Sequence, residues 1–185
     1  MNIGIKPISK DTFNHKVKIR FKNILDGFNN YKYKNLIGSN IIDFKSNERE
    51  FIRFLEEAYK LNESKVKNKT ICYIDFYLKD LSDAEYNKLL EGLDREDRDL
   101  LNRIRSVFMS NPPITTEYFE VNDISIIPLL TKMCTRELFF ITFYFTELPL
   151  TIWGNFNLIF PIFFEDENVL NKYIDIADIC NLIIE

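Results

Sequence analysis

The chain offers few residues for nucleophilic catalysis, because it contains a single histidine and three cysteines. A site that needs two imidazoles is excluded, and a Ser-His-Asp or Cys-His arrangement would depend on His15 alone. His15 stands beside Lys16 in a lysine-rich segment, which favours a solvated side chain. No Walker loop, glycine-rich dinucleotide turn or Gly-x-Ser-x-Gly elbow occurs in the sequence.

The cysteines Cys72, Cys134 and Cys180 lie far apart and form no Cys-x-x-Cys pair. No signal peptide is recognisable at the first residues, so we expect a cytoplasmic protein with free thiols. Lys132 and Arg136 flank Cys134 and would lower the pKa of an exposed thiol there. Burial of all three thiols is the expectation that we prefer.

The strongest enzymatic pattern is Asp43-Phe44-Lys45, which follows two isoleucines and precedes a predicted helix. It resembles half of the motif of the restriction-type nuclease fold. There, two acidic residues hold Mg²⁺ and a lysine stabilises the attacking water or the scissile phosphate. The resemblance implies a Mg²⁺-dependent nuclease that uses Asp43 and Lys45, with Asp26 or else Asp11 as the second acid. Outside this alternative we expect no metal and no cofactor.

A basic segment is the preferred candidate for partner binding. Lys16, Lys18, Arg20 and Lys22 alternate with apolar residues, which predicts a half-exposed strand with one basic face. An anionic partner would relieve the repulsion on that face, whereas the alternative is a solvated edge whose lysines prevent aggregation. A helix is also open, because apolar residues recur at three-to-four spacing between residues 13 and 28.

Charge is unevenly distributed along the chain. Residues 1–70 hold 15 Lys or Arg and 8 Asp or Glu, a net charge of about +7, while residues 71–185 are acidic and the whole chain carries −4. Such polarity steers charged partners or promotes head-to-tail association. Alternatively, the two parts neutralise each other within one fold.

An aromatic region, residues 138–164, contains eight of the seventeen phenylalanines. Proline, glycine and asparagine interrupt it, so it does not provide the roughly 20 apolar residues of a membrane helix. From Phe139 onward, apolar residues at odd positions face one way and residues 140, 142, 144 and 146 face the other, which predicts a strand.

The remaining patterns indicate an α+β protein that forms a single globular domain over residues 1–185. Further strands are predicted over residues 70–78, 114–121, 150–153 and 156–164. Helices are predicted from Asn47, after the capping box Ser82-x-x-Glu85, from Asp94 to Pro112-Pro113, over 126–136 and from Asp166. The expected sheet has about five to six strands, is mixed or mainly antiparallel, and packs against several helices.

Together these features favour a non-catalytic cytosolic interaction protein, such as an immunity protein or a subunit of a bacterial or phage defence system. Its partner is expected to be a protein, bound through Lys16, Lys18, Arg20 and Lys22, with nucleic acid as a second possibility through the basic residues 1–70. No membrane association is expected. The alternatives are the nuclease described above and a homo-oligomeric structural protein.

Overall fold

The computed structural model describes residues 3–63, 71–109 and 114–185. Within them, one sheet contains β1 (Ile5–Pro7), β2 (Lys34–Gly38), β3 (Cys72–Asp75), β4 (Tyr118–Val121), β5 (Thr142–Phe145), β6 (Leu150–Trp153), β7 (Phe160–Phe164) and β8 (Ile183–Ile184). The strand order is β1-β4-β3-β5-β6-β7-β2-β8, and every neighbouring pair is antiparallel.

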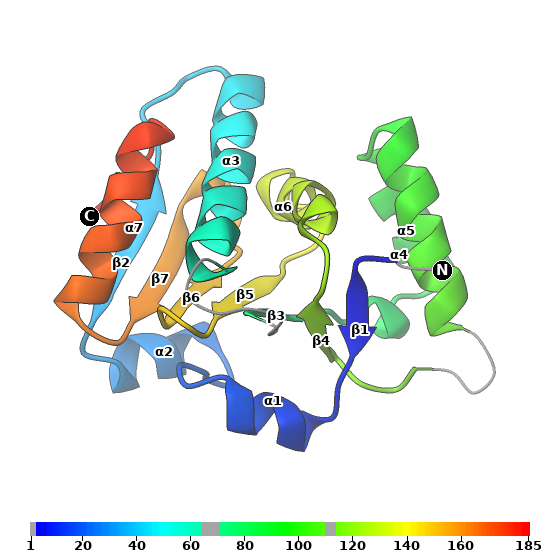
Figure 1. Cartoon of the computed structure of the whole chain (residues 1–185). Helices are drawn as coiled ribbons and strands as arrows, with labels where there is room; N and C mark the ends of the chain where they lie inside the picture. The colour runs from blue at the N-terminus through cyan, green and yellow to red at the C-terminus, as the bar shows by residue number, and fades with distance from the viewer. Residues whose placement is uncertain (1–2, 64–70, 110–113) are drawn as a thin grey trace.

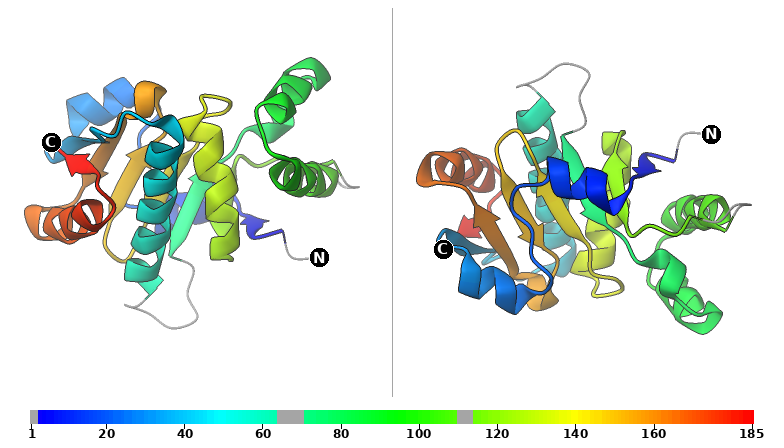
Figure 2. Two further views of the ribbon diagram at one scale, coloured as in Figure 1. Left: turned by 90° about the horizontal axis from the view of Figure 1, so that it is seen from above. Right: turned by 90° about the horizontal axis from the view of Figure 1, so that it is seen from below.

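Seven helices surround this sheet in the described residues: α1 (Lys10–Lys16), α2 (Ile24–Asn30), α3 (Phe44–Glu63), α4 (Asp83–Glu91), α5 (Arg95–Phe108), α6 (Ile127–Thr135) and α7 (Glu167–Ile179). The helices α3, α6 and α7 cover one face, α1 and α2 lie on the opposite face, and α4 and α5 stand beside the end that carries β1 (Figures 1 and 2). The α+β prediction is therefore confirmed.

Most of the predicted helices are present because their local signals are strong. The capping box before α4 forms: the Ser82 N–H donates to Glu85 at 2.8 Å, and the Glu85 N–H donates to Ser82 Oγ at 3.3 Å. Pro128 lies in the first turn of α6, where no hydrogen bond is lost. The start of α3 at Asn47 is wrong, because Asp43 accepts the Ser46 N–H at 2.8 Å and begins the helix earlier.

The strand predicted over residues 16–22 is wrong. Lys16 ends α1, and residues 17–23 form an extended segment that crosses the sheet face outside the strand ladder. Its backbone is held by side chains instead: Thr151 Oγ1 donates to the Ile19 carbonyl at 2.7 Å, and the Tyr31 hydroxyl bonds both backbone groups of Arg20. The expected alternation survives, since Val17 and Ile19 are buried while Lys18 and Arg20 are exposed.

The predicted count of five to six strands is also wrong, because β1, β2 and β8 were missed. These strands have two to five residues and no sustained apolar alternation. Pairing with longer neighbours defines them, so local sequence carries a weak signal. The first residue of the strand predicted over 70–78 and the helix stop at Pro112-Pro113 lie outside the described residues.

The alternation from Phe139 onward is confirmed in space. Phe143 and Phe145 belong to the main core under the long helices. Tyr144 points to the opposite face, where it packs with Phe13 and Val17 in a second, smaller cluster. Both faces of the central strands are therefore apolar and need a cover.

In the part of the chain that the structure describes, no helix has the length and apolarity needed to cross a bilayer.

A partly buried ion pair joins the buried Glu48 of α3 to Arg136 at the end of α6. The Glu48 carboxylate accepts Arg136 Nε at 2.8 Å and Nη2 at 2.9 Å, and Thr135 Oγ1 adds a bond of 3.0 Å. Arg136 also donates to the Gly92 carbonyl at 3.0 Å and to Asp94 at 3.3 Å. This side chain therefore ties the α4–α5 pair to the helices above the sheet.

Replacing Arg136 with methionine should destabilise the fold, because the Glu48 carboxylate would stay buried without its cation. We expect the free energy of unfolding to fall by about 3 kcal/mol, measured by urea denaturation. The matched control is Lys18→Met, which removes the exposed pair with Glu165 and should cost about 0.5 kcal/mol or less. Equal losses in the two variants would contradict the structural role of Arg136.

Candidate ligand-binding pocket

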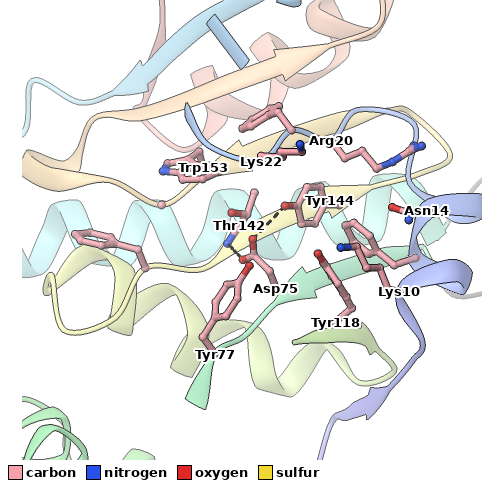
Figure 3. A pocket seen from close by; sticks show the side chains of 14 residues that line it. Lys10, Asn14, Arg20, Lys22, Asp75, Tyr77, Tyr118, Thr142, Tyr144 and Trp153 are labelled. Carbon is pink, nitrogen blue, oxygen red and sulfur yellow. Dashed lines mark hydrogen bonds between the residues drawn. The ribbon is translucent and has the colours of Figure 1, made fainter. Parts of the chain in front are cut away.

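A cavity of about 460 Å³ opens on the face of the sheet that α1 and α2 only partly cover (Figure 3). We call it the sheet-face pocket. It is lined by Lys10, Phe13, Asn14, Arg20, Phe21, Lys22, Asp75, Tyr77, Tyr118, Phe140, Thr142, Tyr144, Trp153 and Gly154. Its lining comes from α1, the extended segment 17–23 and four adjacent strands or their ends, and its volume suits a small organic molecule.

Asp75, the last residue of β3, forms the centre of the pocket. Its Oδ1 accepts the backbone N–H of Thr142 at 2.8 Å, and its Oδ2 accepts the Tyr144 hydroxyl at 3.1 Å. Burial raises the pKa of Asp75 to about 6, and these hydrogen bonds offset part of that shift. A carboxylate in this position costs free energy at neutral pH, which is a common property of functional sites.

Two further tyrosines, Tyr77 and Tyr118, lie beside Asp75 (Figure 3). Burial, together with the negative charge of Asp75, raises the pKa of both phenols, so they remain protonated donors at neutral pH. Neither hydroxyl has a hydrogen-bond partner among the residues that the structure describes. Both are therefore available to a ligand.

Aromatic rings form the walls. Phe21, from the extended segment, stacks on Trp153 with ring centroids 5.4 Å apart and also contacts Phe163 edge to face at 4.6 Å. On the side of α1, Phe13 stacks on Tyr118 at 4.2 Å. These contacts fix the aromatic faces before any ligand arrives, which lowers the entropic cost of binding a planar group.

Three cationic side chains, Lys10, Arg20 and Lys22, also line the pocket. Over the described ranges, none of them has an acidic partner, and Arg20 donates one hydrogen bond to the Val17 carbonyl. In Figure 3, Trp153 lies at one end of the pocket, Lys10 lies at the other, and Asp75 lies between them. We call the side of Trp153 the aromatic end and the side of Lys10 and Arg20 the cationic end, and Lys22 lies between the two ends.

The structure separates the four basic residues that were predicted to form one face. Lys16 is exposed at the end of α1, and Lys18 lies 3.3 Å from Glu165. Arg20 and Lys22 line the sheet-face pocket together with Lys10. Binding of a protein partner by the four residues stays a prediction. Two of them, Arg20 and Lys22, line the sheet-face pocket instead of an open surface.

The residues of the nuclease alternative are not brought together. Asp43 and Lys45 are exposed at the start of α3, and the hydrogen bond from Ser46 lowers the pKa of Asp43. Asp26 belongs to α2, which lies on the other face of the sheet, as does Asp11 in α1 (Figures 1 and 2). No cluster of three acidic, histidine or cysteine side chains suited to a metal occurs in residues 3–63, 71–109 and 114–185.

The cysteines are free and buried, as expected. Burial raises the pKa of the Cys134 thiol to about 12, so the flanking cations do not activate it. Cys134 instead packs in the main core, and its sulfur accepts the Ile141 N–H at 3.3 Å.

Sequence reasoning missed the residues at the centre of this pocket. One signal was available: Asp75 is the only charged residue among residues 71–78, an otherwise apolar strand pattern. A lone carboxylate in a buried strand needs hydrogen-bond partners, which makes Asp75 a candidate functional residue. The convergence of Tyr77, Tyr118 and Trp153 had no such local signal, because they come from three separate strands or their ends.

Comparisons of the chain with protein-family models, with curated proteins and with solved structures found no match. The interpretation of the pocket therefore depends on its own geometry.

Asp75→Asn should stabilise the protein at neutral pH and leave it nearly unchanged at pH 4. The pKa of Asp75 is raised in the folded state to about 6, so the wild type loses stability as pH rises from about 4 to about 6 while the variant does not. Above pH 7 the variant should be more stable by on the order of 2 to 3 kcal/mol, measured by urea denaturation across pH. The control, Asp175→Asn on the exposed side of α7, should show no such slope, and a pH-independent difference for Asp75→Asn would contradict the proposed shift.

Proposed function

We propose that this protein binds a small organic anion with a planar apolar part, and that the ligand occupies the sheet-face pocket. The observation that carries the proposal is the convergence of several hydrogen-bond donors on one concave site. The ammonium groups of Lys10 and Lys22 and the hydroxyls of Tyr77 and Tyr118 have no partner in the described part of the chain. All four groups are hydrogen-bond donors, and Lys10, Lys22 and Tyr77 are exposed to solvent, so a ligand rich in acceptors would replace water as their partner.

The net charge of the pocket lining also supports an anionic ligand. Three cations and one carboxylate give the lining a net charge of +2 when Asp75 is ionised. Lys10, Arg20 and Lys22 are exposed at the edge of the pocket, so their combined attraction for an anion should weaken as the salt concentration rises. The stacked rings of Phe21 and Trp153 supply the apolar contact for a planar group.

The interaction role inferred from composition, including the immunity or defence role and the nucleic-acid partner, is a separate proposal. Lys16 and Lys18 are exposed outside the pocket and would be the residues available for it. Ligand binding in the pocket is compatible with such a role, because the two use different side chains.

The test uses naphthalene-2-sulfonate and phenyl phosphate as probe anions in isothermal titration calorimetry. The fluorescence of Trp153, the only tryptophan, reports whether they enter the pocket. In the double variant Lys10→Gln/Lys22→Gln, affinity should fall by about 100-fold, since each of the two charged contacts contributes on the order of tenfold.

The matched control is Lys16→Gln/Lys45→Gln, which removes two exposed cations outside the pocket and should leave affinity within about twofold. Binding that is lost equally in both double variants would show nonspecific charge attraction. Absence of binding to either probe in the unmodified protein would overturn the proposal.

A further inference from the structure

We propose that the anion is a ribonucleoside phosphate, held with its base against Trp153, its ribose hydroxyls toward Asp75 and its phosphate toward Lys10 and Arg20. This inference rests on the proposed function, since it names the class of ligand for the same pocket. It follows from the order in which the pocket presents its groups.

The aromatic end suits a nucleobase. Trp153 and Phe21 are stacked within 25° of parallel, and Phe21 is fixed from behind by Phe163 and Tyr31. A prearranged aromatic face binds any of the four bases through stacking, because every base has a π-face. The site therefore selects a planar heterocycle without selecting a particular base.

The centre of the pocket suits neighbouring hydroxyl groups. A carboxylate has about four acceptor positions, and the Thr142 N–H and the Tyr144 hydroxyl fill one on each oxygen of Asp75. The remaining positions can accept hydroxyl protons, as acidic residues do for ribose in dinucleotide-binding sites. Tyr77 and Tyr118, with free hydroxyls, stand on the same side and can donate to ribose oxygens.

The cationic end suits a phosphate. Lys10, Asn14 and Arg20 lie together at the end of the pocket away from Trp153 (Figure 3). The planar guanidinium of Arg20 still has donors after its bond to the Val17 carbonyl, and Arg and Lys are the usual ligands of phosphate. A phosphate monoester carries between about −1.5 and −2 at neutral pH, which matches the net charge of +2 from the charged side chains in the lining.

Charge balance also separates this ligand from an aromatic amino acid. An amino acid would place an ammonium near Asp75 and a carboxylate near the lysines. Its own net charge is zero, so the net charge of +2 from the charged side chains of the lining would remain uncompensated. A nucleotide compensates them while offering neutral hydroxyl donors to Asp75.

The experiment measures binding of AMP, GMP, CMP and UMP by calorimetry and by Trp153 fluorescence. Adenosine, ribose 5-phosphate, 2′,3′-dideoxy-AMP, tryptophan and phenyl phosphate serve as comparison ligands. The four nucleotides should bind within about tenfold of one another. Each comparison ligand lacks one of the three recognised parts, or carries the wrong charge, and should bind at least about tenfold more weakly than AMP.

Asp75→Asn isolates the ribose contact. An amide accepts through one oxygen only, so the preference for AMP over 2′,3′-dideoxy-AMP should shrink from about tenfold to about twofold. The substitution removes a buried charge, and a urea denaturation curve shows that the variant is folded. Asp175→Asn, on the exposed side of α7, is the control and should keep the full preference. An unchanged preference in Asp75→Asn would overturn the assignment of Asp75.

Other outcomes separate this inference from the proposed function. If phenyl phosphate binds in a manner that depends on Lys10 and Lys22 but AMP binds no more tightly, the nucleotide assignment falls and the anion pocket stands. If neither phenyl phosphate nor AMP binds, both the nucleotide assignment and the anion-binding function are wrong.

The same nucleotide unit can also come from an RNA end. A 5′-phosphorylated RNA decamer that competes more strongly than AMP would identify RNA as its source, and weaker competition would identify the free nucleotide.

Discussion

A sheet whose two faces are both apolar must be covered on both sides, and here the two covers are unequal. The helices α3, α6 and α7 cover one face, and Phe143 and Phe145 belong to the main core beneath them. The other face receives two seven-residue helices and one extended segment, which together cover its ends and leave the middle open. Phe13 and Val17 pack on one side of the gap, and Phe21 packs on the other. The sheet-face pocket is the space that remains between them.

Asp75 gives that space its chemical character. Burying a carboxylate among aromatic rings is costly, and the bonds from Thr142 and Tyr144 offset only part of the cost. A serine or asparagine would meet the same backbone donor without a charge. A residue that lowers stability at the end of a well-packed strand is consistent with selection for binding, which is the usual trade-off at functional sites. The three cations of α1 and of segment 17–23 outnumber this carboxylate, so the pocket favours a ligand with a negative charge.

The charge polarity of the chain is resolved partly inside the fold. Lys6 pairs with Glu120, Lys18 pairs with Glu165, and Glu48 is buried against Arg136, so residues from the basic and the acidic part of the chain neutralise one another. The cations of the pocket are left out of these pairs. Local neutralisation therefore leaves the attraction of the pocket for an anion in place.

The sequence by itself determined the elements with strong local signals: the capped helices, the aromatic strands and the two-residue alternation that sends Tyr144 to the opposite face from Phe143. It also determined which residues of segment 16–22 are exposed, since burial follows the alternation of cationic and apolar side chains. Only the tertiary structure decided that this segment is not a strand, because its backbone forms hydrogen bonds with the side chains of Thr151 and Tyr31 instead of with a neighbouring strand. It also decided the pocket, because that site joins residues from α1, segment 17–23 and four strands or their ends. Their proximity depends on strand order and register, which are set by long-range pairing and leave no trace in local spacing.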